Sequence, residues 1–394
     1  MEIKIEKIIY PGKSLGFSEN KTILTNEGIP GEIVEVIPLE EKKNYIEAKT
    51  VKIITPSSAR VTPACSHYQA CSPYQYIDYK TQLAIKESQL REIFPDANII
   101  ITPSPEIWGY RNNIRLNIIW KDNLAFLAYH TPETRDMFMH IDSCNLVSEN
   151  VNNLLASFIK LVNKENLNFI KEIKVRESRG RSRPSPTKDL MLTVYPPACR
   201  DGFETRPYIE EIVSEKTFRI GPDSFFQINI PMLEAALKEI KKHLNPEKKE
   251  TIADLYCGIG TFGIAFSQYV KEIIGIESSP DNISFLKSNL KLNNINNFKL
   301  YEGDCEKLFP SLMTKSIDML MLDPPRKGLD NMLCQHILLS SIKKIIYLSC
   351  NPTTLSRDLK ILGQRYAIKT LHMFDFFPHT PHIETLAILE KKQL

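Results

Sequence analysis

From about residue 221 onward, short apolar segments alternate with segments whose apolar residues recur at helical spacing. The apolar segments predict strands at 251–255, 272–277, 298–302, 317–322 and 344–349, and the periodic segments predict helices at 232–244, 261–268, 280–293 and 332–340. Strands joined through helices pair in parallel, because each crossover returns the chain to the same edge of the sheet. The pattern therefore predicts a doubly wound α/β domain that binds its ligand at the carboxyl ends of the strands.

The first 220 residues carry two other patterns. Residues 1–55 hold short alternating segments separated by turn signals such as Pro11-Gly12, which predicts a small β-barrel. The next part mixes helical spacing at 76–94 and 150–163 with strand-like segments at 113–120 and 190–195. This mixture predicts an α+β domain. The expected domains are 1–55, 56–220 and 221–394.

The composition excludes a membrane protein and a disulfide-rich secreted protein. Hydrophobic residues make up 42% of the chain, but no apolar run approaches the ~18 residues that cross a bilayer. The amino-terminal segment contains no secretory signal, and the eight cysteines are scattered along a long chain, so we expect reduced thiols. We expect a cytoplasmic monomer that makes no membrane contact.

One segment is strongly basic, although the net charge of +3 does not indicate a nucleic-acid-binding protein. Residues 171–188 carry seven basic side chains against two acidic ones and include Gly180, Pro184 and Pro186, which predicts a basic loop. Such a loop either contacts phosphate groups or is only a solvated surface, and the sequence leaves both interpretations open.

A glycine-rich segment, Asp254-Leu-Tyr-Cys-Gly258-Ile-Gly260, joins the first strand of the α/β domain to a helix. The two glycines permit a tight turn and a close approach of the backbone to a ligand. The spacing also matches dinucleotide-binding loops, but Asp254 would repel a pyrophosphate and attract a cationic amino-acid group. S-adenosyl-L-methionine carries such a group, so the segment favours this cofactor over a nicotinamide dinucleotide.

Two further acids follow the next strands. Glu277 ends the second strand, where a carboxylate can accept both hydroxyls of a ribose, and Asp304 follows the third, where it suits an adenine amino group. A single acid of this kind is often a helix cap or a surface residue. Acids at three successive strand ends favour a cofactor site instead.

The ends of the fourth and fifth strands carry candidate catalytic residues. The fourth ends in Asp323-Pro-Pro-Arg326, and because enzymes that methylate exocyclic amines place an aromatic residue after the prolines, Arg326 disfavours that reaction. The fifth ends in Ser-Cys350-Asn-Pro. A strand-end cysteine is commonly a buried apolar residue, but a nucleophile is favoured here, since a carbon without lone pairs needs covalent activation before it attacks a methyl group.

These segments, followed by Phe-Pro-His-Thr-Pro-His-Ile-Glu384, resemble the RNA (uracil-5-)-methyltransferase family, whose Ser-Cys-Asn-Pro and His-Ile-Glu signatures are highly specific. The resemblance extends over nearly the whole chain, because Gly16-Phe17 and Pro30-Gly31-Glu32 resemble a TRAM module, an OB-like barrel that contacts RNA or acts as a spacer. It implies a Rossmann-like class I methyltransferase domain after a central α+β domain and an amino-terminal TRAM barrel.

The resemblance also implies a reaction cycle. The thiolate of Cys350 adds to C6 of a uracil, and C5 then attacks the methyl group of S-adenosyl-L-methionine. Glu384 removes the C5 proton as general base, and departure of the thiolate releases 5-methyluridine. Asp323 and Arg326 hold the uracil edge and stabilise the charge that develops on its oxygen.

By the same resemblance, the cofactor pocket is lined by Gln227, Tyr256, Gly258, Gly260, Thr261, Glu277, Asp304 and Asp323. Gln227 belongs to the segment Phe225-Phe-Gln-Ile-Asn, which matches the Phe-x-Gln-x-Asn element of the family. Phe225 either stacks on the target base or packs in a core. His379 and His382 stand close to Glu384, where they either help a proton leave or only pack the loop.

Some family members bind an iron-sulfur cluster through cysteines spaced C-x5-C-x2-C and a distant fourth cysteine. Here Cys65 and Cys71 keep the first spacing, Cys144 suits the distant ligand, and Tyr74 stands at the third position. Three thiolates are too few for the usual four-ligand 4Fe-4S cluster. We therefore expect a degenerate remnant without metal, with a three-iron or labile cluster as the alternative.

The resemblance implies an RNA substrate, and 23S ribosomal RNA is favoured over transfer RNA because bacterial transfer-RNA members typically lack the barrel. Enzymes that make 5-methylcytidine share the thiol addition, but they usually place a cysteine after the proline of the fourth-strand motif, where this chain has none. A third interpretation is a noncatalytic RNA-binding or assembly factor. The presence of Cys350 and Glu384 together with the cofactor acids argues against it.

Overall fold

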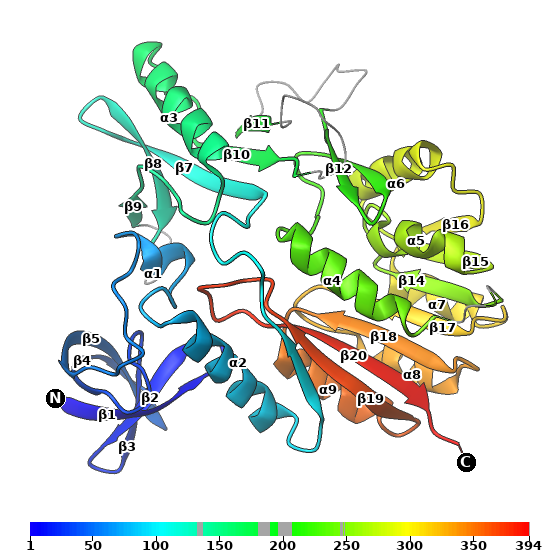
Figure 1. Ribbon diagram of the computed structural model, residues 1–394, viewed down its shortest axis with the longest axis horizontal. Helices are drawn as coiled ribbons and strands as arrows, with labels where there is room; N and C mark the ends of the chain where they lie inside the picture. The colour runs from blue at the N-terminus through cyan, green and yellow to red at the C-terminus, as the bar shows by residue number, and fades with distance from the viewer. Residues whose placement is uncertain (132–136, 180–189, 196–206, 245–246, 248, 394) are drawn as a thin grey trace. The chain divides into compact units, whose positions relative to one another are not determined.

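The computed structural model describes residues 1–131, 137–179, 190–195, 207–244, 247 and 249–393 (Figure 1). The chain divides into two compact units. The first unit comprises residues 1–96 and 377–383, and the second comprises 97–376 and 384–394. Residues 56–96 thus group with the barrel, and the expected division into three domains stays a prediction. In the described part of the chain, no helix has the length and apolar character needed to cross a membrane.

The first unit contains a closed five-stranded barrel, as the sequence predicts. Its strands are β1 (Glu2–Ile9), β2 (Lys13–Ser18), β3 (Lys21–Thr25), β4 (Ile33–Glu41) and β5 (Tyr45–Thr55), in the order β1-β2-β3-β5-β4. The pairs are antiparallel except for β3 with β5. Alternate residues point inward, and the barrel core consists of Ile3, Ile5, Ile23, Val34, Val36, Ile46 and Ala48.

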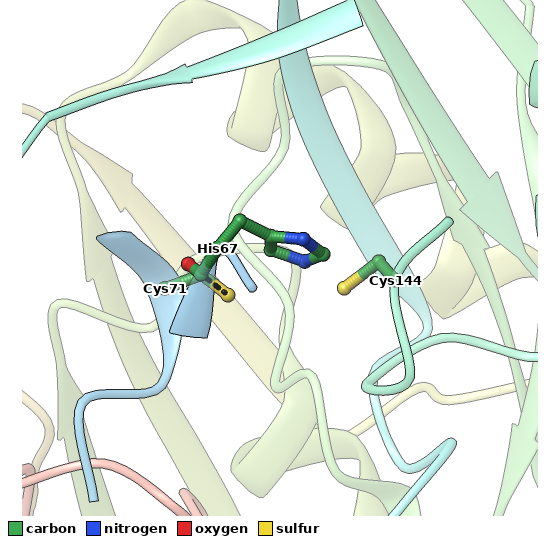
Figure 2. A group of neighbouring side chains, drawn as sticks. All are labelled: His67, Cys71 and Cys144. Carbon is green, nitrogen blue, oxygen red and sulfur yellow. Dashed lines mark hydrogen bonds between the residues drawn. The ribbon is translucent and has the colours of Figure 1, made fainter. Parts of the chain in front are cut away.

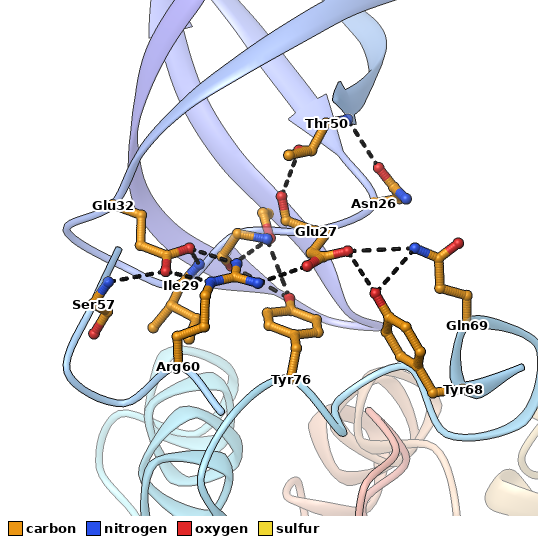
Figure 3. Close-up of polar contacts among 12 residues, drawn as sticks. Asn26, Glu27, Ile29, Glu32, Thr50, Ser57, Arg60, Tyr68, Gln69 and Tyr76 are labelled. Atoms are coloured by element: carbon orange, nitrogen blue, oxygen red, sulfur yellow. Dashed lines mark hydrogen bonds and ion pairs between the residues drawn. The ribbon is translucent and has the colours of Figure 1, made fainter. Parts of the chain in front are cut away.

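A buried ion-pair network fastens the segment that follows the barrel to the turn between β3 and β4 (Figure 3). The guanidinium of Arg60 donates to Glu32 and to Glu27, each at 2.7 Å. Glu32 also accepts the backbone N–H groups of Ile29 at 2.8 Å and Ser57 at 3.0 Å. Although burial raises the pKa of Glu32, these donors outweigh it and lower the pKa. A buried carboxylate with so many donors stays charged and orders the turn.

Two helices, α1 (Tyr68–Cys71) and α2 (Tyr79–Ile93), complete the first unit. Asp78 caps α2 by accepting the N–H of Thr81 at 3.0 Å. The buried face of α2 is unusually polar, because Gln82 and Lys86 have almost no exposed surface. Both hold segment 377–383: Gln82 binds His379, and Lys86 Nζ donates to the carbonyl of Phe377 at 3.1 Å.

The second unit is built on an eight-stranded sheet in the order β16-β15-β14-β17-β18-β20-β19-β6. The strands are β6 (Ile99–Thr102), β14 (Thr251–Leu255), β15 (Glu272–Glu277), β16 (Phe298–Glu302), β17 (Met319–Leu322), β18 (Lys344–Ser349), β19 (Tyr366–Phe374) and β20 (Glu384–Lys391). All pairs are parallel except those of β20, which runs antiparallel to both neighbours. This sheet confirms the predicted Rossmann-like fold class.

Helices flank this sheet. They are α4 (Ile230–Lys241), α5 (Thr261–Phe266), η1 (Ser267–Tyr269), α6 (Pro280–Leu292), α7 (Cys305–Leu312), α8 (Asn331–Leu339) and α9 (Pro352–Leu362). In one layer α4 packs against α5, and in another α8 packs against α7 and α9 (Figure 1). The predicted helix at 232–244 instead begins at 230, because Asn229 supplies a cap and a proline follows at the first turn.

A second, antiparallel sheet of this unit has the order β11-β10-β7-β8-β9. Its strands are β7 (Asn113–Lys121), β8 (Leu124–His130), β9 (Phe138–His140), β10 (Glu172–Glu177) and β11 (Leu190–Tyr195); helix α3 (Glu149–Lys164) packs on it, and β12 (Ile209–Val213) and β13 (Lys216–Ile220) form a separate hairpin. The helix and strands predicted at 150–163, 113–120 and 190–195 match α3, β7 and β11 closely.

The predicted basic loop at 171–188 is wrong over its first part, because residues 172–177 form strand β10, which lies between β11 and β7 in the sheet. Alternating side chains there face the protein interior, and Arg176 is almost fully buried. Arg179 forms ion pairs with Glu106 at 3.4 Å and Glu177 at 3.6 Å. These two arginines therefore have internal partners. Of the other five basic residues, Lys171 and Lys174 are described, whereas Arg181, Arg183 and Lys188 lie outside the described residues.

Candidate active site

The glycine segment leaves β14 in a left-handed turn. Tyr256, Gly258 and Gly260 have φ angles of 62°, 58° and 91°, and α5 begins directly afterward at Thr261. A Cβ at Gly260 would lie 2.4 Å from Leu286 Cδ1, whereas one at Gly258 would meet no atom within 4 Å. Gly260 is thus required by packing, and Gly258 leaves open space beside the backbone, as a ligand cradle needs.

Asp254 lies fully buried behind this turn. Its Oδ2 accepts the N–H of Gly263 at 3.0 Å, and among the described residues no group donates to its Oδ1. Burial raises the pKa of Asp254 to about 8, and the nearby carboxyls of Asp323 and Glu277 add to the rise. A buried carboxyl oxygen without a donor is costly, and an adjacent cation would relieve this cost.

Glu277 connects the end of β15 to the glycine turn. One carboxylate oxygen accepts the N–H of Gly258 at 2.8 Å, and the other accepts those of Ser278 at 2.9 Å and Ser279 at 2.7 Å. A carboxylate offers about four acceptor positions, so some capacity remains for a ligand hydroxyl. Glu277 therefore shapes the turn in addition to any contact with ribose, a role that the sequence did not suggest.

Two other residues expected at the cofactor pocket, Asp304 and Tyr256, lie near the end of β15 and in the glycine turn. Gly303 donates its N–H to the carbonyl of Glu277 at 2.8 Å, which places Asp304 beside the end of β15. Asp304 itself is partly exposed and pairs with Lys307 at 2.8 Å. The hydroxyl of Tyr256 donates to Glu306 at 3.0 Å. Contact of these side chains with a cofactor stays a prediction.

The candidate catalytic side chains meet at the ends of β17, β18 and β20. Ser349 pairs with Thr385 across β18 and β20, so Cys350 and Glu384 follow at adjacent positions. The pKa of the Cys350 thiol is raised to about 11, chiefly by burial and also by the carboxyls of Glu384 and Asp323, whereas the charge of Arg326 and a hydrogen bond from it oppose the rise. These interactions require the four side chains to be close together.

The two carboxyls of this cluster also hold protons strongly. Burial raises the pKa of Glu384 well above its ordinary value; Asp323 adds to the effect, and Arg326 opposes it. Burial alone raises the pKa of Asp323 to about 7. Such shifts are typical of sites that hold and transfer protons. The sequence motifs thus converge on a thiol, two carboxyls and one guanidinium beside the glycine turn.

Phe225 is 65% exposed, so the interpretation that it packs in a core is wrong. Its neighbour Phe226 is the buried one and contacts Phe218 with ring centroids 5.8 Å apart. The sequence missed the residue that holds this segment, Arg176, whose Nη2 donates to the carbonyl of Ser224 at 2.8 Å. Burial lowers the pKa of Arg176 to about 10. Arg176 lies in the basic segment, but nothing in the composition indicated that it is buried.

Loop packing accounts for the two histidines near Glu384. In the first unit, His379 is buried, with its N–H bound to Gln82 Oε1 at 2.9 Å and its Nδ1 3.0 Å from Gln82 Nε2. His382 contacts the ring of Phe377 edge-on at 5.8 Å. Of the two interpretations left open by the sequence, these contacts favour packing.

The cysteines of the expected metal set fall in different units. Cys65 and Cys71 belong to the first unit, and Cys144 belongs to the second. Cys71 Sγ lies 3.9 Å from the carbonyl oxygen of His67 on the same turn (Figure 2), and the sequence did not single out this histidine. Tyr74, at the third position of the motif, is buried in an apolar cluster of the first unit. The expected remnant without metal and the alternative of a three-iron or labile cluster both stay predictions.

Three comparisons with known proteins agree. Residues 206–392 match the family model described as tRNA (Uracil-5-)-methyltransferase. A Vibrio campbellii protein described as a 23S rRNA (uracil(1939)-C(5))-methyltransferase is 26% identical over 99% of this chain and 95% of its own. A Nostoc protein described as an uncharacterized RNA methyltransferase is 29% identical over 100% of this chain and 96% of its own.

A solved structure shares the fold of the entire chain. The structure of Pyrococcus abyssi tRNA (uracil-54, C5)-methyltransferase in complex with S-adenosyl-L-homocysteine superposes with a TM-score of 0.80 and covers 98% of this chain and 100% of its own, at 23% identity. Residues 206–392 match the model of the tRNA (uracil-5-)-methyltransferases, and the chain is similar over nearly its full length to RNA methyltransferases, including one described as acting on uracil C5.

Proposed function

We propose that the protein methylates C5 of a uridine in RNA, with S-adenosyl-L-methionine as methyl donor and Cys350 as nucleophile. The observation that carries the proposal is the grouping of Cys350, Glu384, Asp323 and Arg326 at adjacent strand ends beside the glycine turn. A thiol, a base and a cation in one place are the groups that covalent activation of a pyrimidine requires.

The residues of the glycine turn fit the cofactor. The buried Oδ1 of Asp254 has no donor among the described residues and suits the ammonium group of the methionine moiety. Gly258 leaves open space at the backbone, and Glu277 retains acceptor capacity for a ribose hydroxyl. When bound, the cofactor supplies an electrophilic methyl group.

The chain's residues then act in sequence. The Cys350 thiol loses its proton, and the thiolate forms a bond to C6, which moves the electron pair of the C5–C6 double bond toward C5 and the O4 carbonyl. C5 takes the methyl group as the bond from that group to the sulfonium sulfur breaks, which would leave a neutral thioether. The Glu384 carboxylate removes the hydrogen of C5, and the C6–S bond breaks, which restores the double bond and the thiolate. Arg326, beside Cys350, stabilises the negative charge in the ring.

The target uridine must leave its base stack to reach Cys350. Phe225, exposed next to Gln227, offers an aromatic face for the extruded base or a neighbour. We favour 23S ribosomal RNA as the substrate, because a relative aligned over nearly the full length is described as acting on it. Transfer RNA is the second candidate, because both the family model and the Pyrococcus structure carry that description.

Two variants test the mechanism on purified protein and on 23S and transfer RNA from cells that lack it. Cys350→Ala should abolish 5-methyluridine formation, measured by mass analysis of nucleosides, and should still bind S-adenosyl-L-methionine. The matched control is Cys334→Ala, which changes a buried cysteine of α8 and should retain activity. Full turnover by Cys350→Ala would contradict the mechanism, and 5-methylcytidine as the product would contradict the substrate.

Glu384→Gln tests the base separately. Without a carboxylate, C5 cannot lose its proton after methylation, so the protein should remain bonded to RNA through Cys350. The adduct is expected as a slow-moving band on a denaturing gel, and it should be absent when Cys350→Ala is added. Normal product release by Glu384→Gln would remove Glu384 from the proposed mechanism.

A further inference from the structure

The loop that carries Arg326 is fastened to α9 along its whole length. This Arg326 loop, residues 324–330, joins β17 to α8. The carbonyl of Arg326 accepts hydrogen bonds from Asn351 Nδ2 at 3.1 Å and Thr354 Oγ1 at 3.2 Å. Both donors belong to the cap or the first turn of α9. The backbone of Arg326 is therefore held directly at the start of this helix.

The next turn of α9 holds the rest of the loop. Arg357 Nη2 donates to the carbonyls of Lys327 at 2.9 Å and Leu329 at 3.0 Å. The same guanidinium binds Asp358 at 2.7 Å. One arginine thus joins two loop carbonyls to a neighbouring carboxylate, and such charge-assisted bonds are stronger than neutral ones.

Asp358 is fully buried and accepts bonds from three different elements. Its Oδ2 accepts the N–H of Leu329 at 2.8 Å and the hydroxyl of Tyr347 at 2.7 Å, and its Oδ1 accepts Arg357. Tyr347 lies on β18, the strand that leads to Cys350. The carboxylate therefore joins the Arg326 loop, β18 and α9 in one network.

The loop passes so close to this network that only glycine fits at one position. Gly328 has a φ angle of 74°, and a Cβ there would lie 2.6 Å from Asp358 Oδ2 and 2.7 Å from Arg357 Nη2. Loop and helix are therefore in direct contact. Because α9 begins two residues after Cys350, any displacement of the loop from α9 also moves Arg326 relative to Cys350.

We propose that Arg357 and Asp358 are positioning residues that hold the Arg326 guanidinium against Cys350, so that the thiolate forms where the substrate binds. The groups that act electrostatically on Cys350 are Glu384, Asp323 and Arg326, and Arg326 is the cation among them. If the loop detaches, the thiol faces two carboxyl groups without the opposing charge, and its pKa rises. The proposal rests on the proposed role of Cys350.

The test is the pH dependence of alkylation at Cys350 in the full-length protein. Wild type and Arg357→Gln are treated with iodoacetamide at a series of pH values, and the peptide that contains Cys350 is quantified by mass spectrometry. The variant should show an apparent pKa higher by about 0.5 to 1 pH unit. The matched control is Lys360→Gln, which removes a positive charge from an exposed position of the same helix and should leave the profile unchanged.

Turnover supplies the second measurement. Arg357→Gln should lower kcat about tenfold near neutral pH and recover toward wild type as the pH rises, with the KM for RNA and the affinity for S-adenosyl-L-methionine unchanged. The kcat of Arg357→Lys, whose ammonium group keeps a positive charge and can still donate, should fall between those of wild type and Arg357→Gln. A purely structural role would instead lower activity equally at every pH.

The proposal is overturned if Arg357→Gln and wild type share one alkylation profile. Should Arg357→Gln fail to fold, Thr354→Val removes a single bond to the Arg326 carbonyl and should give a smaller shift in the same direction. A different result would contradict the proposed function. If wild-type protein with alkylated Cys350 still methylated RNA, Cys350 would not be the nucleophile.

Discussion

The two segments that lead to the catalytic cluster are held in different ways. The Arg326 loop is fastened within the second unit by α9, through the charged side chains of Arg357 and Asp358. Segment 377–383, which leads into Glu384, belongs instead to the first unit, where α2 holds it through Gln82 and Lys86. The proposed nucleophile Cys350 and its neighbour Arg326 thus lie in the same unit as the contacts that hold them, whereas the segment before the proposed base Glu384 belongs to the first unit.

This difference shows that the first unit contributes, in addition to the barrel, the segment that precedes Glu384. Residues 376 and 377 fall in different units, as do 383 and 384, so the chain passes from one unit to the other and returns just before Glu384. The backbone that enters β20 is therefore restrained by contacts of the first unit. We therefore expect damage to α2 to affect Glu384, the proposed base, and damage to α9 to affect Cys350, the proposed nucleophile.

Gln82→Leu is expected to give one of the two largest effects. Gln82 Oε1 accepts the N–H of His379, and its Nε2 donates to the carbonyl of Ile77 at 2.8 Å, all in buried surroundings. Leaving these groups without partners should lower the free energy of unfolding by about 3 kcal/mol, measured by urea denaturation. Gln364→Leu, at an exposed position, is the matched control. Equal stability of the two variants would show that α2 does not anchor the segment.

Substitutions of two glycines allow a direct comparison of segment 377–383 with the Arg326 loop. A Cβ at Gly12 would lie 2.7 Å from Pro381 Cβ, and one at Gly328 would meet the ends of two side chains. A proline ring yields less than a side-chain end, so Gly12→Ala should cost about 3 kcal/mol of unfolding free energy and Gly328→Ala about 2 kcal/mol. Gly328→Ala should nevertheless raise the pKa of Cys350, and Gly12→Ala should not.

Gly31→Ala is the control for backbone strain alone. Gly31 has a φ angle of 92° but open space where a Cβ would lie, so the cost should be only about 1 kcal/mol. Thermal or urea unfolding of the three variants measures the series. A loss for Gly31→Ala as large as that for Gly12→Ala would attribute the effect to φ rather than to contact with segment 377–383.

The pH dependence of the first covalent step separates nucleophile from base. Because burial raises the pKa of Cys350 to about 11, the thiol is protonated near neutrality, and adduct formation should increase about tenfold for each pH unit below that value. The raised pKa of Glu384 does not enter this step, because the proposed mechanism needs its carboxylate only later, when the C5 proton is removed. Single-turnover rates between pH 6 and 9 would measure the slope, and a flat profile would contradict this account.

The sequence predicted the parts of the site that depend on local spacing. The glycine turn, the acids at strand ends and the strand that leads to Cys350 all follow from short motifs within regular elements. The helix α9 and the strands β19 and β20 were not anticipated, and neither was the antiparallel direction of β20. Parallel and antiparallel strands have the same alternation, so periodicity alone does not distinguish them.

The supporting contacts had no signal in the sequence for a different reason. Gln82 and His379 are 297 positions apart, and a buried hydrogen bond between them imposes no repeat on either segment. Arg176 and Arg357 similarly bind backbone carbonyls, and a carbonyl gives no indication of its partner in the amino-acid sequence. The positions of the candidate residues at strand ends were therefore predictable from motifs, whereas the contacts that hold them became visible only in the fold.

The smallest expected effect compares the helix caps of the two units. Asp78 caps α2 and Ser279 caps α6, each by accepting a backbone N–H of the first turn. Substitution by alanine at either position should cost about 1 kcal/mol of unfolding free energy. Only Asp78→Ala loosens the helix that holds segment 377–383, so it should slow product release, which needs Glu384, more than Ser279→Ala does. If the two variants released product at equal rates, the cap of α2 would not affect Glu384. The restraint on the segment before Glu384 would then come from Gln82 and Lys86 alone.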